Sequence, residues 1–119
     1  MGGEPLKAIC LEARRLRDET ELLEDQFYCK EVSLAICYKA SEAGIRTSLC
    51  IGTFKDLDGH PRDHYWVRHE KTIYDATADQ FDPKLAEIHI VSELDAVQYD
   101  EHNFVIFNPE IARIIKKMK

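Results

Sequence analysis

The sequence has no run of apolar residues that approaches the roughly 20 needed to cross a bilayer as a helix, so we expect no role in a membrane. Its first residues, Met-Gly-Gly-Glu-Pro, lack the basic and apolar regions of a secretory signal peptide. Its four cysteines, Cys10, Cys29, Cys37 and Cys50, include no CxxC pair, which disfavours a structural zinc site. Without a secretory signal, disulfides are disfavoured too. We therefore expect a cytoplasmic protein with reduced thiols.

Positive charge is also scarce. With 16 basic and 22 acidic side chains the net charge is −6, which argues against a protein that binds the phosphate backbone of nucleic acids. The basic cluster Lys116, Lys117 and Lys119 suits the C-terminal end of a helix. The 45% of hydrophobic residues is ordinary for a globular protein, and 119 residues predict a single domain over 1–119.

Two helices are predicted in the first third of the chain. From Pro5 to about Asp25, apolar residues recur at helical spacing. The segment from Cys29 to Ala43 is apolar on most faces, so we expect a central and largely buried helix. Gly44 suits the position just after its end, where a left-handed conformation is common.

After Gly44 the hydrophobic period changes to that of strands. Strands are predicted over Arg46–Phe54, His64–His69, Thr72–Thr77, Ile88–Val91 and Asn103–Phe107. Asn108 and Pro109 then suit the start of a last helix. This order predicts an α+β fold in which N-terminal helices pack on an antiparallel sheet, followed by a C-terminal helix.

The turns between these strands have recognisable chemistry. Glu70 and Lys71 form the short connection between the second and third predicted strands. The run Asp-Leu-Asp-Gly-His-Pro at 56–61 has part of the spacing of a calcium loop, but its later acidic positions are missing. A hairpin turn is therefore the stronger prediction at 56–61.

Cys29 is the cysteine best placed for chemistry. A thiol becomes a good nucleophile when a helix N-terminus or a nearby imidazolium lowers its pKa. Cys29 stands at the predicted start of a helix, whereas Cys10 and Cys37 fall inside helices and Cys50 falls inside a strand. We expect Cys29 to be partly exposed, and Cys37 and Cys50 to be buried.

A base and its orienting group are predicted on the neighbouring hairpin. If residues 70 and 71 are the loop, His69 faces Thr72, and His64 and Asp75 share one face of the sheet as diagonal neighbours. A register shift of one residue would separate them. We expect His64 to line a cleft, so that its replacement by alanine would cost little stability.

Three segments resemble the core of the transglutaminase-like branch of the papain-like cysteine hydrolases. They are Phe-Tyr-Cys-Lys-Glu-Val-Ser-Leu-Ala at 27–35, His-Tyr-Trp-Val at 64–67 and Ile-Tyr-Asp-Ala-Thr at 73–77. The gaps of 35 residues from Cys29 to His64 and of 11 from His64 to Asp75 suit that family. The run Asp-Ala-Thr-Ala-Asp-Gln-Phe at 75–81 also resembles small bacterial and phage proteins of this type. The resemblance covers about residues 25–82.

The resemblance implies a papain-like core and a Cys-His-Asp triad. Cys29 would attack an amide or ester carbonyl to form an acyl-enzyme. His64 would activate the thiol and later protonate the leaving group, while Asp75 would hold the imidazole tautomer. No cofactor or metal is expected for this chemistry.

The residues that would bind the substrate are less defined. The backbone N–H of Cys29 would be one oxyanion donor, and Gln26 and Gln80 are candidates for a side-chain donor. Trp66 is a candidate for the core or for a wall of the cleft.

The expected function is that of a thiol protease or related enzyme: a peptidase, amidase or glutamine deamidase that acts on a peptide or protein amide. The alternative is a non-catalytic module that keeps the fold and binds a peptide or a protein. The substrate and the oligomeric state stay open.

Overall fold

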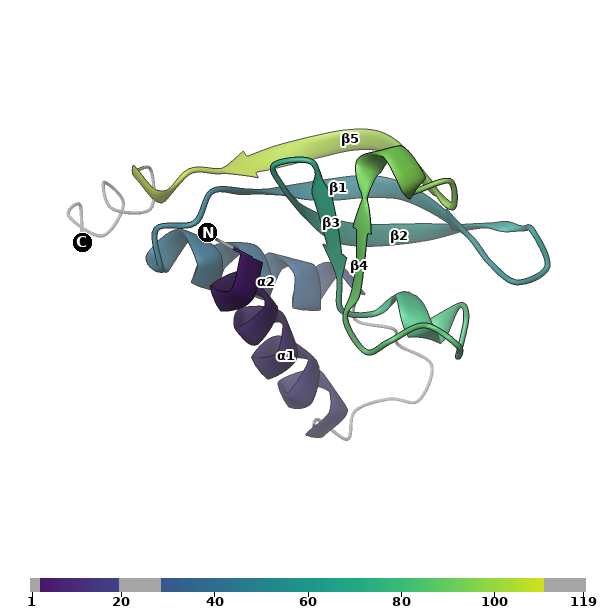
Figure 1. The fold of residues 1–119 in the computed structure, drawn as a ribbon, viewed down its shortest axis with the longest axis horizontal. Helices are drawn as coiled ribbons and strands as arrows, with labels where there is room; N and C mark the ends of the chain where they lie inside the picture. Colours follow the sequence, from purple (N-terminus) through teal and green to yellow (C-terminus); the bar gives the residue numbers. More distant parts are fainter. Residues whose placement is uncertain (1–2, 20–28, 111–119) are drawn as a thin grey trace.

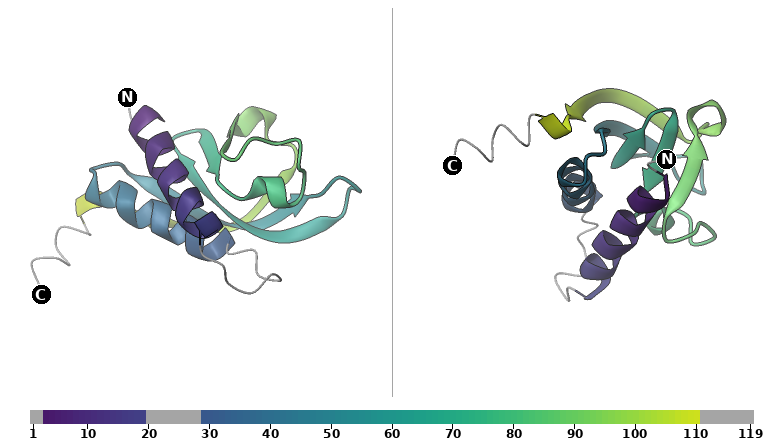
Figure 2. Two further views of the ribbon diagram at one scale, coloured as in Figure 1. Left: turned by 90° about the horizontal axis from the view of Figure 1, so that it is seen from below. Right: turned by 60° about the vertical axis from the view of Figure 1, so that its left-hand side comes forward.

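The computed structural model describes residues 3–19 and 29–110 of the chain. Two helices, α1 (Gly3–Glu19) and α2 (Cys29–Glu42), lie on one side of a five-stranded sheet and cross each other there (Figures 1 and 2). The strands are β1 (Thr47–Lys55), β2 (Pro61–His69), β3 (Thr72–Asp75), β4 (His89–Ser92) and β5 (Tyr99–Phe107). Short 3-10 turns, η1 (Ala78–Gln80) and η2 (Glu93–Asp95), flank β4. The predicted α+β class is confirmed.

All the strand pairs are antiparallel, and the order across the sheet is β4-β3-β2-β1-β5. β1 and β2 form a hairpin, and the Glu70–Lys71 turn joins β2 to β3 with His69 opposite Thr72, as predicted. β5 starts four residues earlier than predicted, at Tyr99. Its first half is polar, so it has no alternating apolar pattern that could reveal a strand.

The ends of the helices follow local chemistry. Gly44 has a φ of +82°, and its N–H donates to Ser41 while the N–H of Ile45 donates to Ala40 at 2.8 Å. These two bonds form the glycine-ended helix terminus that was predicted at Gly44. The side-chain oxygen of Asn108 accepts a hydrogen bond from the N–H of Glu110, as an N-cap does. The rest of the predicted C-terminal helix lies outside the described residues. So do residues 20–25, the end of the first predicted helix.

α2 is less buried than its composition indicates. It buries one face, formed by Val32, Ser33, Ile36, Cys37, Ala40 and Ser41. On its other side Ala35 is exposed, and Tyr38 is 54% exposed. The prediction of a largely buried helix is wrong because, within residues 3–19 and 29–110, only the sheet and α1 cover α2, and exposed apolar side chains are common on protein surfaces.

The sheet packs on both of its faces. The main core lies between the helices and the sheet and includes Leu6, Cys10, Val32, Ile36, Cys37, Ala40, Leu49, Val67 and Tyr74. A second cluster of Cys50, Trp66 and Ile73 lies on alternate strand positions and packs with Tyr99, Val91 and Ala96. Cys37 and Cys50 are fully buried, which confirms their predicted placement. All four cysteines are free thiols in the structure.

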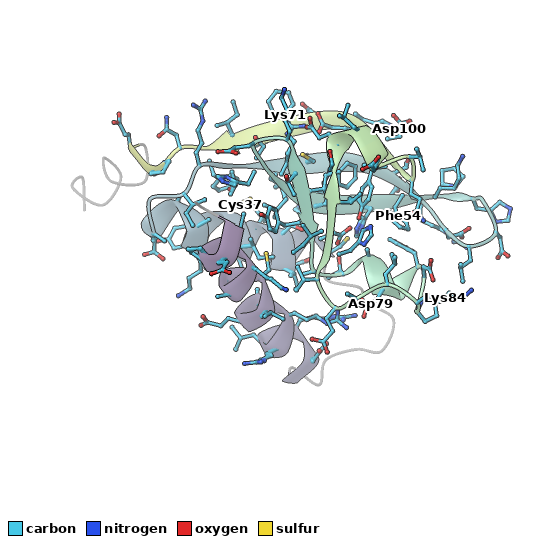
Figure 3. All side chains as sticks on the ribbon, viewed as in Figure 1. Cys37, Phe54, Lys71, Asp79, Lys84 and Asp100 are labelled. Atoms are coloured by element: carbon cyan, nitrogen blue, oxygen red, sulfur yellow. The ribbon has the colours of Figure 1, made fainter. Side chains whose placement is uncertain are left out.

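Arg14 ties α1 to the segment that follows β3. Its guanidinium donates to both carboxylate oxygens of Asp79 at 2.8 and 2.7 Å and to the carbonyl oxygens of Ala76 and Glu87. Lys71 comes just before β3, and Asp79 lies beyond the other end of that strand (Figure 3). The Arg14 side chain is almost fully buried, so these bonds are made with little competition from water.

We expect Arg14→Met to lower the free energy of unfolding by about 2–4 kcal/mol, because it leaves Asp79 and two carbonyl oxygens without their charged donor. Methionine keeps much of the apolar stem. The matched control is Arg15→Met at an exposed position of the same helix, for which we expect less than about 0.5 kcal/mol. Urea unfolding measures both, and equal losses would show that the Arg14 contacts contribute nothing specific.

Candidate functional site

His64 and Asp75 meet inside the protein at the end of the β2–β3 hairpin. The register places Val67 opposite Tyr74, so His64 and Asp75 lie on the same face of the sheet. Nε2 of His64 lies 2.6 Å from Oδ2 of Asp75, and both side chains are 0% exposed. The predicted diagonal pair is therefore in direct contact.

The Asp75 carboxylate is surrounded by donors. Oδ2 also accepts a hydrogen bond from the hydroxyl of Tyr99 at 2.8 Å, and Oδ1 accepts one from the N–H of Thr77 at 2.9 Å. Burial alone raises the pKa of Asp75, but the charge of His64 and these hydrogen bonds bring that pKa below its ordinary value. Asp75 is thus a buried anion, and Nε2 of His64 must be the donor in the bond between them.

His64 is correspondingly basic. Burial lowers its pKa, but the charge and hydrogen bond of Asp75, followed by smaller contributions from the Cys29 thiol, raise the pKa to about 9. At neutral pH the imidazole is therefore protonated. Its Nδ1 is buried and has no hydrogen-bond partner of good geometry among the described residues.

Cys29 is the first residue of α2 and is partly buried. Its thiol is close enough to His64 to raise the pKa of the imidazole. The structure thus brings the thiol beside the His64 imidazole at the start of a helix. The other three thiols are buried, and burial raises the pKa of Cys10 to about 12 and of Cys37 to about 11.

Aromatic rings enclose His64 on several sides. The rings of Phe81, Phe54 and Trp66 have centroids 5.0, 5.7 and 5.9 Å from that of His64. The expectation of a cleft-lining histidine with little packing is therefore wrong, and His64→Ala would leave a cavity. These rings come from β1, β2 and the segment after η1, so no local pattern reveals the enclosure.

Of the substrate-binding candidates, Trp66 is 1% exposed and packs against Tyr99, with ring centroids 4.9 Å apart. Trp66 therefore belongs to the core and offers no surface to a substrate. Gln80 lies at the end of η1, and its amide nitrogen and oxygen are both shielded from solvent without a partner among the described residues. Gln26 lies outside the described residues.

Gly52 allows β5 to approach the site. It pairs with His64 in the β1–β2 ladder, and a Cβ atom at Gly52 would lie 1.9 Å from the carbonyl oxygen of Asp100. The β1–β5 register shifts at this point, between Ile51 and Gly52. Only glycine permits this contact, which brings Tyr99, the neighbour of Asp100, towards Asp75.

The 56–60 segment is the predicted hairpin turn. Oδ1 of Asp56 accepts hydrogen bonds from the N–H groups of Asp58 and His60, and Oδ2 binds Arg62 at 2.9 Å. Carboxylate and imidazole atoms of Asp56, Asp58 and His60 do lie within 4.8 Å of one another. The Asp56 carboxylate already accepts hydrogen bonds from the backbone of the turn and from the Arg62 side chain. The cluster is therefore explained as part of the turn.

Neither α1 nor α2, as far as the structure describes them, has the length and apolar character of a membrane span. Comparisons with protein-family models, with curated proteins and with solved structures gave no match for this chain. The chemistry of the site itself therefore carries the functional interpretation.

Proposed function

We propose that this protein is a cysteine-dependent hydrolase or acyl-transferase with a transglutaminase-like core, acting on an amide bond of a peptide or protein. The observation that carries the proposal is the buried His64–Asp75 ion pair beside the Cys29 thiol. Burying two charges costs free energy that an apolar pair would not. Strongly shifted pKa values of this kind gather at catalytic sites.

In the proposed reaction the Cys29 thiolate attacks the substrate carbonyl, and the oxygen of the tetrahedral intermediate takes up the negative charge. The N–H of Cys29, at the start of α2, is one donor to that oxygen. His64 transfers its proton to the leaving amine as the C–N bond breaks, which leaves a thioester on Cys29. Neutral His64 then removes a proton from water, or from an acceptor amine, as that molecule attacks the thioester, and the Cys29 thiolate is released beside a protonated His64.

Gln80 is the candidate for the second oxyanion donor. Its buried amide bonds to nothing in the part of the chain that the structure describes, and an unbonded buried amide destabilises a fold by about 1–3 kcal/mol. Such a group is expected where it serves a ligand. Its neighbour Phe81 contacts the His64 ring, so η1 lies close to the proposed site.

The test uses the reactivity of Cys29 and needs no known substrate. We expect iodoacetamide at neutral pH to alkylate Cys29 in the native protein at least about tenfold faster than it alkylates glutathione, because the proposed mechanism makes Cys29 the nucleophile of the site. Peptide mapping by mass spectrometry identifies the modified residue. The comparison with glutathione is needed because burial alone protects the other three cysteines. A Cys29 that reacts no faster than glutathione would favour the non-catalytic binding module.

A further inference from the structure

Tyr99 reaches the site from a strand that does not adjoin Asp75. In the sheet, β2 and β1 separate β3 from β5, yet the Tyr99 hydroxyl donates to Oδ2 of Asp75 at 2.8 Å. The same oxygen accepts the 2.6 Å bond from Nε2 of His64. One carboxylate oxygen is therefore shared between the imidazole and the phenol.

The Tyr99 ring has little freedom to move. Its centroid lies 4.9 Å from those of both Phe54 and Trp66, in edge contacts, and the His89 ring stacks on it at 6.3 Å. The close passage of β5 over Gly52 fixes the backbone next to it. The hydroxyl is thus aimed at Asp75 by packing from several strands.

The chemistry of the hydroxyl is equally restricted. Burial, together with the charge of Asp75, raises the pKa of Tyr99, so the phenol keeps its proton at any working pH. Facing a carboxylate, it can only donate. Asp75 has no exposed surface at which water could replace this donor.

We infer that Tyr99 is a positioning residue of the site, an inference that rests on the proposed function: its hydroxyl holds Oδ2 of Asp75 against Nε2 of His64, which leaves Nδ1 for the Cys29 thiol. Tyr99 would not touch the substrate. It acts through Asp75, by keeping the carboxylate ionised and by preventing it from rotating away from the imidazole.

The test compares Tyr99→Phe with Tyr74→Phe. The first removes the hydroxyl and keeps the packed ring; the second makes the same chemical change at a tyrosine in the core on the helix side of the sheet. We expect Tyr99→Phe to slow alkylation of Cys29 by iodoacetamide at neutral pH by about tenfold, the scale of one lost charge-assisted hydrogen bond. Tyr74→Phe should change the rate less than about twofold.

A pH readout separates positioning from stability alone. In Tyr99→Phe the Asp75 carboxylate is no longer held against Nε2, so we expect the His64 ring to titrate at lower pH in NMR spectra than in the unmodified protein or in Tyr74→Phe. An unchanged titration and an unchanged alkylation rate in Tyr99→Phe would overturn the inference.

The Asp75→Asn variant distinguishes the two levels of the argument. If Asp75→Asn slows alkylation and Tyr99→Phe adds nothing further in that background, the hydroxyl acts through Asp75 as inferred. If the slowing by Tyr99→Phe is the same with and without Asp75→Asn, the hydroxyl does not act through Asp75. If Asp75→Asn leaves alkylation unchanged, the proposed function fails and the inference falls with it. Should Asp75→Asn not fold, His64→Gln replaces it as the background for the same comparison.

Discussion

Replacing His64 by Gln is expected to lower the rate at which the protein cleaves p-nitrophenyl acetate by about 10²–10⁴-fold, the usual contribution of a general acid and base. Glutamine is the informative choice because its side-chain amide can donate to Asp75 as Nε2 does, and it fills much of the space among the aromatic rings. The variant therefore removes the titrating group with the smallest disturbance of the packing. Release of nitrophenolate measures the rate, and Cys29→Ser supplies the background.

His64→Gln also has a signature in the pH dependence of stability. The pKa of His64 in the folded protein, about 9, lies above its ordinary value of 6.5. The contribution of the charged imidazole to stability is thus complete below pH 6.5 and is lost as the pH rises through 9. We expect the difference in unfolding free energy between the unmodified protein and His64→Gln to shrink over that interval. A difference independent of pH would mean that His64 is neutral in the folded state.

Among the described glycines, Gly52 is the one whose replacement by alanine is expected to cost the most stability. The new Cβ would meet the Asp100 carbonyl oxygen at 1.9 Å and Glu101 Cα at 3.0 Å, and both are backbone atoms of β5 that cannot rotate away. β5 would have to move off β1, so we expect a loss of about 3 kcal/mol or more in urea unfolding. Alkylation of Cys29 should also slow, because Tyr99 moves with β5.

The control for Gly52→Ala is Gly59→Ala in the β1–β2 turn. Gly59 has a φ of +81° but open space around its Cβ position, so alanine there meets only the cost of a left-handed backbone, about 1 kcal/mol. Site reactivity should be unchanged in this variant. A Gly52→Ala protein no less stable than Gly59→Ala would show that the close approach of β5 does not exist in solution.

The parts of this fold that could be predicted from sequence depend on local rules. Gly44 ends α2 because it is the residue that accepts a positive φ without strain. The two-residue turn at 70–71 fixes the β2–β3 register, and the strand period of two then places His64 and Asp75 on one face. Each of these predictions needed only neighbouring residues.

The parts that could not be predicted depend on contacts between distant segments. Tyr99 is 24 residues from Asp75 in the chain and reaches it only because β5 pairs with β1. Arg14 bonds residues 62 to 73 positions away. The burial of His64 needs rings from several elements. In each case the residue types were visible in the sequence, but the topology that joins them was not.

The most direct test of the proposed site is the mass of the protein during reaction with p-nitrophenyl acetate. If Cys29 is the nucleophile, one acetyl group should accumulate per chain. Peptide mapping should place this group on Cys29 as a thioester, and hydroxylamine should remove it. Cys29→Ser should not acquire this thioester under the same conditions. Native protein that gains no acetyl group on Cys29, or acetyl groups on surface lysines alone, would contradict a nucleophilic role for Cys29 and leave the His64–Asp75 pair as a structural ion pair.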